Sequence, residues 1–203
     1  MERDQSENQE ALQRKTLWIV LLLNVGLAAA FIVTGILADS SALIANGLDN
    51  GSDGIVYGLS LLALSRSMHW KEFAASASGV LLLVFAAGVL ADVVRRYYQG
   101  SEPIGPTMIG MSIVAGVINY GCLRLLQRLE AKDVNLRAAA TFSFNDFISN
   151  GGIVLAGLLV LWLRAAWPDL VVGLATALIQ FWGGVKILRD ARQTAREGEK
   201  TDG

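Results

Sequence analysis

Long apolar stretches separated by short polar connections make up most of the chain. Each stretch has about 20 residues, the length that an α-helix needs to cross about 30 Å of hydrocarbon. Six such stretches cover approximately residues 16–37, 42–65, 73–95, 104–127, 138–163 and 170–188. A backbone inside a lipid bilayer must satisfy its own hydrogen bonds, and long continuous apolar runs are not typical of barrel strands. The pattern therefore predicts an all-α polytopic membrane protein with six transmembrane helices.

The composition supports a membrane protein over a soluble one. Of the 203 residues, 53% are hydrophobic and 17% are charged, whereas about a quarter of the residues in a soluble domain are charged. The alternative is a soluble helical bundle with unusually apolar helices, which the lengths of the stretches disfavour. The net charge of −1 gives no reason to expect nucleic acid as a partner.

Lysine and arginine residues are distributed unevenly between the two sides of the predicted membrane domain. Of the 17 basic residues, 14 lie in the tails and in connections on the same side, and only Arg95, Arg96 and Arg164 lie on the other. Because basic loops stay in the cytoplasm, both termini are expected there. The expected organisation is a polar cytoplasmic tail over 1–15, a six-helix transmembrane domain over 16–190 and a short charged cytoplasmic tail over 191–203, with no soluble C-terminal domain.

Three carboxylates lie far from the ends of the predicted helices. Asp49 and Asp53 lie midway along the second apolar stretch, and Asp146 lies in the fifth. Placing one carboxylate at the centre of a bilayer costs on the order of 2.5–3.5 kcal/mol on insertion scales. No lysine or arginine lies at a similar depth to neutralise them. Acidic residues in such positions are candidates for binding a cation or carrying protons.

The spacing of these aspartates allows one shared site. Residues i and i+4 lie on the same helical face, so Asp49 and Asp53 can point to one spot, and Asp146 adds a third oxygen ligand if the second and fifth helices pack together. Small residues nearby favour such close packing; they are Ala45, Gly47, Gly51, Gly54, Gly58, Gly151 and Gly152. Burial and mutual repulsion favour protonated carboxyl groups in the empty site, and a divalent cation would displace those protons. Competition of this kind is the thermodynamic basis of an antiporter.

Several polar residues admit more than one interpretation. The three aspartates can alternatively serve only as hydrogen-bonding links between helices. Asn24 and Asn119 are expected to form hydrogen bonds between helices, with the lining of a cation path as the alternative. Asp92 lies one turn from the arginine pair at 95–96, which favours an interfacial ion pair. Asp39 is expected to cap the second helix, the alternative being attraction of cations.

The second predicted helix resembles that of the cation diffusion facilitator family of divalent-metal/proton antiporters. Members carry S-x-A-L-x-A-(D/N)-x-x-(H/D)-x-x-x-D there, which stands here as Ser40, Ala42, Leu43, Ala45, Asn46, Asp49 and Asp53. The fifth resembles L-R-A-A-x-x-H-x-x-x-D-x-x-x-(S/N), seen here as LRAAATFSFNDFISN over 136–150. The resemblance implies that Asp49, Asp53 and Asp146 are metal ligands and that Asn150 is a polar position one turn beyond.

One departure from the family pattern lies inside this expected site. Phe142 stands where family members have histidine or aspartate as the fourth ligand, and a phenyl ring cannot bind a metal. Water, or one of the auxiliary candidates Asn46, Ser143 and Asn150, can complete the coordination. A shell made only of oxygen atoms is harder than one with imidazole, which weakens selectivity for zinc and admits manganese. The missing histidine also leaves proton coupling to the aspartates.

A second departure concerns the end of the chain. Typical members continue into a cytoplasmic metal-binding domain that joins two protomers, whereas this chain ends in a charged tail over 186–203. A homodimer is therefore expected to be held by transmembrane helices. Small residues in the third helix, at Ala75, Gly79, Ala87 and Gly88, suit close helix contact and suggest a seam there.

The resemblance implies a secondary transporter in the bacterial inner membrane. It would export divalent transition-metal cations, zinc-like metals first and cadmium, manganese or iron as further candidates, in exchange for protons. No prosthetic group is expected, only the transported cation. An enzyme is not expected, because the sequence has no phosphate-binding G-x-x-x-x-G-K-[ST] loop and no histidine accompanies the membrane serines. The alternatives are a membrane metal sensor without transport and an exporter of small organic cations.

Overall fold

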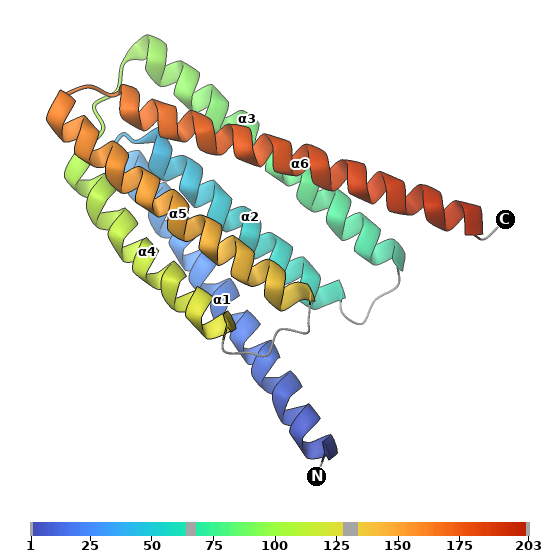
Figure 1. The fold of residues 1–203 in the computed structure, drawn as a ribbon. Coiled ribbons are helices and arrows are strands. Elements are labelled where there is room, and N and C mark those ends of the chain that lie inside the picture. Colours follow the sequence, from blue (N-terminus) through green and yellow to red (C-terminus); the bar gives the residue numbers. More distant parts are fainter. Residues whose placement is uncertain (1, 64–67, 128–133, 202–203) are drawn as a thin grey trace.

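The computed structural model describes residues 2–63, 68–127 and 134–201, and over these residues the chain is all helical with no strand (Figure 1). The helices are α1 (Glu2–Leu37), α2 (Ser41–Ala63), α3 (Met68–Gln99), α4 (Gly105–Gln127), α5 (Val134–Leu163) and α6 (Trp167–Thr201). Each coincides with one predicted apolar stretch, and α1, α3 and α6 extend well beyond it. The predicted all-α fold is confirmed.

Three short connections gather at one end of the bundle, which we call the turn end (Figure 1). They comprise residues 38–40, 100–104 and 164–166. Asp39 and Arg164 have a φ of 51°, and Gly100, directly after α3, has a φ of 84°. These left-handed conformations end a helix and reverse the chain within a few residues. Both chain termini extend from the opposite end of the bundle (Figure 1).

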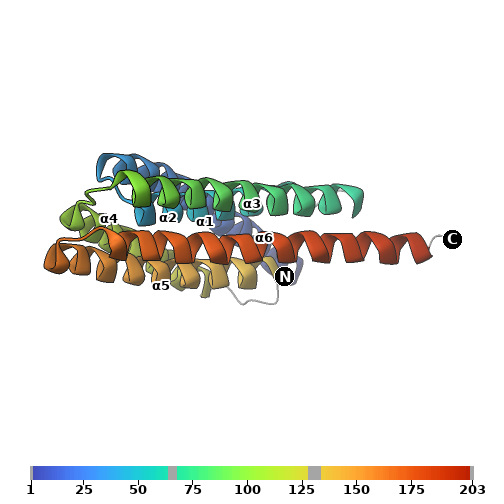
Figure 2. The same cartoon turned by 90° about the horizontal axis from the view of Figure 1, so that it is seen from above.

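The helices form two layers, with α2 in contact with both. Seen from above, α1, α2 and α3 lie in one layer and α5 and α6 in the other (Figure 2), while α4 packs along α5. The α1 helix packs along α2, and α3 packs along α6. Because α2 also contacts α3, α5 and α6, its polar residues lie at the centre of the bundle.

Five helices are long and apolar enough to cross a membrane, counted over the described residues. The apolar segments are Ala11–Leu37, Ser76–Gln99, Gly105–Gln127, Ser143–Leu163 and Trp167–Asp190. The α2 helix occupies the place of the remaining predicted span, but its aspartates and asparagines lower its hydropathy. The other helices surround it, which explains how such a polar helix can be placed in a bilayer. The chain is an integral, polytopic membrane protein.

Buried apolar side chains hold the layers together on either side of the polar residues. Near the turn end, Phe31 of α1, Leu43 of α2, Met108 of α4 and Ile153 of α5 belong to one fully buried cluster. Another cluster toward the chain termini joins the same four helices. A third links α2 to α3 and α6. The polar residues of α2 and α5 therefore lie between two apolar clusters, one near the turn end and one toward the chain termini.

Glycines of α2 allow close packing, but against α1 and not against α5. A Cβ atom on Gly47 would lie 3.0 Å from the backbone nitrogen of Ile32, and Gly54 also faces α1. Gly151 and Gly152 of α5 would meet nothing within 4 Å. The expectation that these glycines bring α2 and α5 together is wrong, because they contact a different neighbour or none.

Gly79 of α3 is used for packing within the chain. A Cβ atom there would lie 2.8 Å from the side chain of Leu188 and 3.2 Å from the carbonyl oxygen of Gly184, both in α6. Because α6 covers Gly79, a dimer seam cannot run through this residue, and the predicted seam is wrong at this position. The side chain of Ala75 lies outside the described residues.

Candidate metal-binding site

The three predicted carboxylate ligands come from two helices that contact each other, α2 and α5. Asp49 and Asp53 are half-buried, one turn apart on α2, whereas only 1% of Asp146 on α5 is exposed. The carboxylates of Asp53 and Asp146 interact electrostatically, and each also interacts with Asp49. The structure therefore brings the three negative charges to one region of the bundle.

The three carboxylates do not form a closed metal shell in this conformation. Over the described residues, no group of three or more histidine, cysteine, aspartate or glutamate side chains lies close enough together to hold one metal ion. The ion pairs found in the same residues do not reach Asp49, Asp53 or Asp146 either. Within the described part of the chain, the three carboxylates therefore form an open group without basic partners.

Asp49 is bound by a residue that the sequence analysis missed, Gln180 of α6. The Gln180 Nε2 group donates to Asp49 Oδ1 at 3.1 Å and to the Ala45 carbonyl oxygen at 3.4 Å. Gln180 is the one amide side chain within the sixth apolar stretch, where its depth matches the middle of α2. A polar residue in that position is a signal that a search limited to charged residues overlooks.

Two predicted auxiliary ligands, Asn46 and Asn150, bind each other. The Asn46 Nδ2 group donates to Asn150 Oδ1 at 3.3 Å, and Ser149 Oγ donates to Asn46 Oδ1 at 3.0 Å. Asn150 also donates to the backbone carbonyl of Asp146 at 2.8 Å. These bonds link α2 to α5 at the level of the carboxylates. An amide oxygen keeps a second lone pair, so both asparagines retain a site that can accept a cation.

Ser143, the remaining auxiliary candidate, lies one turn before Asp146 on α5. Its hydroxyl and Asp146 Oδ2 are both buried, and neither has a hydrogen-bond partner among the described residues. Leaving such a group unpaired costs about 1–3 kcal/mol, so both atoms are available to a cation, a proton or water. Phe142 lies in α5 as predicted, but its side chain lies outside the described residues.

Further buried amides of the bundle interior also keep unpaired atoms. Asn24 of α1 and Asn50 of α2 each donate only to the carbonyl four residues earlier in their own helix, at 2.9 Å. Their side-chain oxygens, and both amide atoms of Asn119 on α4, have no partner within the described part of the chain. The predicted hydrogen bonds from Asn24 and Asn119 to other helices are therefore wrong.

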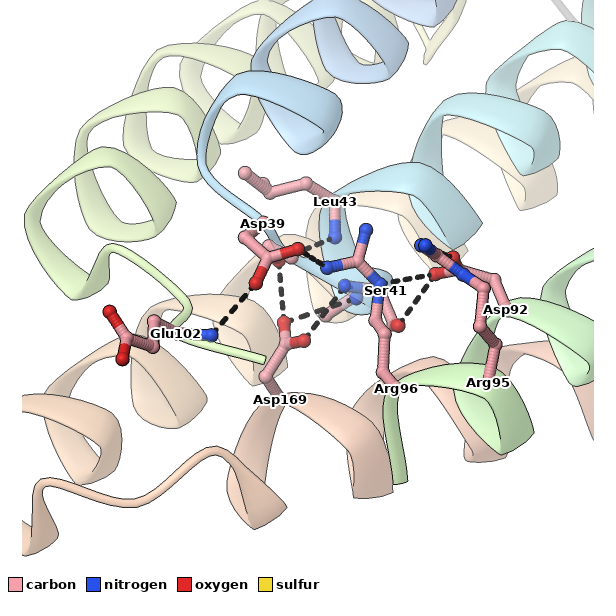
Figure 3. A network of polar contacts seen from close by, with 10 residues as sticks. Asp39, Ser41, Leu43, Asp92, Arg95, Arg96, Glu102 and Asp169 are labelled. Carbon is pink, nitrogen blue, oxygen red and sulfur yellow. Dashed lines mark hydrogen bonds and ion pairs between the residues drawn. The ribbon is translucent and has the colours of Figure 1, made fainter. Parts of the chain in front are cut away.

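At the turn end, acidic side chains are paired (Figure 3). The guanidinium of Arg96, which is 4% exposed, forms ion pairs with Asp92 at 2.7 Å and with Asp39. Asp92 also binds Arg95 at 2.8 Å, so the predicted ion pair is confirmed. Asp39 accepts a further hydrogen bond from the backbone nitrogen of Glu102 at 2.8 Å. The α1–α2 connection is thus tied to α3 and to the start of α4.

The N-terminus of α2 is capped by Ser40 and by Asp169 of α6. Ser40 Oγ accepts from the backbone nitrogen of Leu43 at 3.1 Å, as an N-cap residue does. Asp169 of α6 accepts from the backbone nitrogens of Ser41 at 2.7 Å and Ala42 at 3.1 Å, and from Ser40 Oγ. The prediction that Asp39 caps α2 is therefore wrong, because Asp39 is held by Arg96.

Similarity to known proteins extends over most of the chain. The profile of the cation efflux transmembrane domain matches residues 17–194. The chain is 22% identical over 199 residues to the "Cadmium, cobalt and zinc/H(+)-K(+) antiporter" of Bacillus velezensis, covering 91% of this chain and 64% of that protein. It is 23% identical over 195 residues to "Zinc transporter ZitB" of Escherichia coli, covering 88% of this chain and 62% of that protein.

The matched segment includes the whole of α2 and α5, the helices that carry the two motifs. The chain spans somewhat less than two thirds of the length of these relatives. The matched segment contains all three carboxylates, the whole of α2 to α5 and the apolar parts of α1 and α6. With the profile covering most of its length, the chain belongs to the cation efflux family, the cation diffusion facilitators.

Proposed function

We propose that the protein is a secondary transporter that moves divalent transition-metal cations out of the cytoplasm in exchange for protons. The observation that carries this proposal is the group formed by Asp49, Asp53 and Asp146. These carboxylates interact with one another inside the bundle, and the described ion pairs leave them without a basic partner. Such a group needs either protons or a cation for neutralisation. Relatives named as zinc transporters and as a cadmium, cobalt and zinc antiporter support a metal as the cation.

Proton exchange follows from the electrostatics of this group. With the site empty, repulsion between buried carboxylates favours protonation, so protons reside there. A divalent cation that enters binds the ionised oxygens and releases protons. Because either cargo neutralises the site, the protein can reorient with metal or with protons, but reorientation with neither leaves unpaired charges in the bilayer. That asymmetry couples the two fluxes.

Alternating access would use the layered arrangement of the helices. Asp49 is linked by Gln180 to α6, and Asn46 on the same helix is linked by Asn150 to α5. Rocking of one helix group against another around a fixed midplane site is a common transport motion. In this chain, the long α3–α6 pair is the natural moving group, because it packs against the rest of the bundle mainly through α2.

The chemistry of the site favours hard or borderline cations. Phe142 supplies no ligand, and the predicted ligands are carboxylate, hydroxyl and amide groups, all of which bind through oxygen. Oxygen ligands suit manganese and iron as well as zinc. We therefore propose zinc-like metals as substrates, with manganese favoured more than in a site that contains histidine.

The same proposal includes the placement in the membrane. Arg95, Arg96 and Arg164 lie near the turn end. The other 14 basic residues belong to the tails and connections that were assigned to the opposite side of the membrane. With positive charge inside, both termini face the cytoplasm and the turn end faces outward, across the inner membrane of a bacterium. A homodimer through transmembrane helices remains part of the proposal, with a seam that avoids Gly79.

Flux through the purified protein tests this function. Proteoliposomes loaded with a metal-sensitive dye and a pH indicator should show zinc or manganese uptake accompanied by proton movement in the opposite direction. Asp49→Asn should abolish both fluxes, since the amide cannot carry the exchanged charge. Uptake should also weaken as the pH of the metal side falls, because protons compete for the same oxygens.

The matched control is Asn145→Ala, which changes an exposed side chain next to Asp146 and should leave flux unchanged. Undiminished flux in Asp49→Asn would contradict the site. Metal binding without flux in the wild-type protein would instead favour a membrane sensor.

A further inference from the structure

Gln180 is an unusual residue within the lipid-spanning part of α6. Only 2% of it is exposed, and its side chain points toward α2, where Nε2 faces two acceptors, the Ala45 carbonyl and Asp49 Oδ1. Because both neighbours are acceptors, the amide nitrogen and not the oxygen must face them. The orientation of the amide is thus set by its partners.

The other half of this amide is unused. Gln180 Oε1 is buried and has no hydrogen-bond partner among the described residues. Most buried carbonyl oxygens have a donor, and leaving one unpaired costs about 1–3 kcal/mol. The free acceptor Oε1 therefore lies on the same amide group whose Nε2 binds the carboxylate of Asp49.

The predicted site on α2 and α5 has no ligand at the position of Phe142, and its amide oxygens are already used in one hydrogen bond each. Phe142 stands at a position from which no ligand can come, and Asn46 and Asn150 already bind each other. A cation at Asp49 repels the N–H group of Gln180 and attracts its carbonyl. Rotation about the last bond of the glutamine side chain exchanges the two atoms without moving α6.

We propose that Gln180 is a specificity-determining residue of the cation site. In the empty site its N–H group holds Asp49, and in the loaded site its Oε1 atom binds the cation together with the carboxylates. This inference rests on the proposed function and adds α6 as a third helix that contacts the cargo. A neutral oxygen in place of an imidazole nitrogen shifts preference from zinc and cadmium toward manganese.

The hydrogen bond between Gln180 and Asp49 also connects the cation site to the α3–α6 pair. The α6 helix packs along α3, and Gln180 is the residue that joins α6 to a carboxylate of the site. When a cation binds, the hydrogen bond from Gln180 to Asp49 would be replaced by a bond from Oε1 to the cation. This change would couple the binding of the cation to the position of the α3–α6 pair. Neither of the two sequence motifs contains this residue.

Metal selectivity tests the inference better than total activity does. Zinc, cadmium and manganese would each be titrated calorimetrically into the detergent-purified full chain, and their uptake measured in proteoliposomes. Gln180→His should raise the ratio of zinc to manganese affinity about tenfold or more, because imidazole favours zinc. Gln180→Leu, which removes both donor and acceptor, should weaken the binding of all three metals.

The matched control is Thr176→Val, one turn earlier on α6. Thr176 is also buried, but its hydroxyl donates to the carbonyl of Val172 within its own helix at 3.0 Å. Its substitution should leave the metal ratio unchanged. If Gln180→Leu does not fold, Gln180→His and Gln180→Glu retain polar side chains and provide the same comparison of metals.

The outcomes separate this inference from the proposed function. If the wild-type protein neither binds nor moves these metals, the proposed function fails. If the wild-type protein transports them and Gln180→His keeps the wild-type ratio of affinities, the function stands and the role of Gln180 is refuted. A changed ratio in Gln180→His with an unchanged ratio in Thr176→Val supports it.

Discussion

Acidic side chains occupy two regions of the bundle, the turn end and the interior, and the two regions satisfy them differently. At the turn end, Asp39 and Asp92 bind Arg96, and Asp169 accepts hydrogen bonds from the start of α2. In the interior, Asp49 accepts from a neutral amide, and one oxygen of Asp146 has no partner in the described part of the chain. The same residue type is neutralised in one region and left open in the other.

This difference separates a structural role from an exchange role. A carboxylate that is permanently paired ties helices together and needs no further charge. One that lacks a basic partner must obtain its neutralising charge from a mobile ion, and can also give it up. The paired carboxylates of the turn end therefore suit a structural role that holds α1, α2, α3 and α6 together. The carboxylates of the interior suit reversible binding of an ion.

The largest effect is expected from Arg96→Ala at the turn end. Removing this buried cation leaves Asp39 and Asp92 facing each other, and breaking a buried pair costs about 3–5 kcal/mol. The partial exposure of Asp39 places the expected loss of unfolding free energy at the lower end of that range. Thermal unfolding in detergent would measure it. Arg95→Ala, which removes a side chain that is 54% exposed, should cost far less, because exposed ion pairs contribute little to stability. Equal losses in both variants would contradict a network centred on Arg96.

Unlike Arg96→Ala, Asp146→Asn should weaken metal binding without lowering the stability of the fold. Two unit charges 4 Å apart interact by about 4 kcal/mol at an effective dielectric constant of 20, so loss of this carboxylate should weaken divalent-metal affinity roughly 100-fold or more. Its stability should be unchanged or higher, because a buried carboxylate without a basic partner is removed. Calorimetry and thermal unfolding of the same preparation would show both. A marked loss of stability would mean that Asp146 is a structural link after all.

The smallest effect is expected from the cap of α2. Ser40→Ala removes the acceptor for the Leu43 N–H group and the donor to Asp169, and loss of an N-cap costs about 1 kcal/mol. Ser41→Ala removes only the hydroxyl bound to Asp92 and keeps the backbone bond to Asp169, so it should cost less. Chemical or thermal unfolding would rank the two. A reversed order would show that the hydroxyl bond between Ser41 and Asp92 stabilises the fold more than the Ser40 cap does.

Local features of the structure could be predicted from the sequence. Hydropathy over windows of about 20 residues depends only on neighbouring residues, so the helices and their connections were predicted to within a few residues at most ends. The pairing of Asp92 with two arginines follows from helical spacing alone, because residues three and four apart share a face. The motifs in α2 and α5 were sufficient to indicate the family, which the profile match confirms.

Most of the errors concern the neighbour that a residue contacts. Gly47 packs against α1, Gly79 is covered by α6, and Asn24 bonds within its own helix. A transmembrane helix is apolar around most of its circumference, so its sequence carries little information about which face meets which neighbour. The seam through Gly79 failed for this reason.

What the sequence by itself determined is therefore the set of helices, the family and the presence of three carboxylates far from the helix ends. What only the tertiary structure decided is the choice of partner over long separations. Asp169 caps a helix that begins more than 120 residues earlier, and Gln180 binds Asp49 across a similar separation. The physical reason is that hydropathy and helical spacing act over one or two turns, whereas a buried hydrogen bond between distant helices depends on how the whole bundle packs.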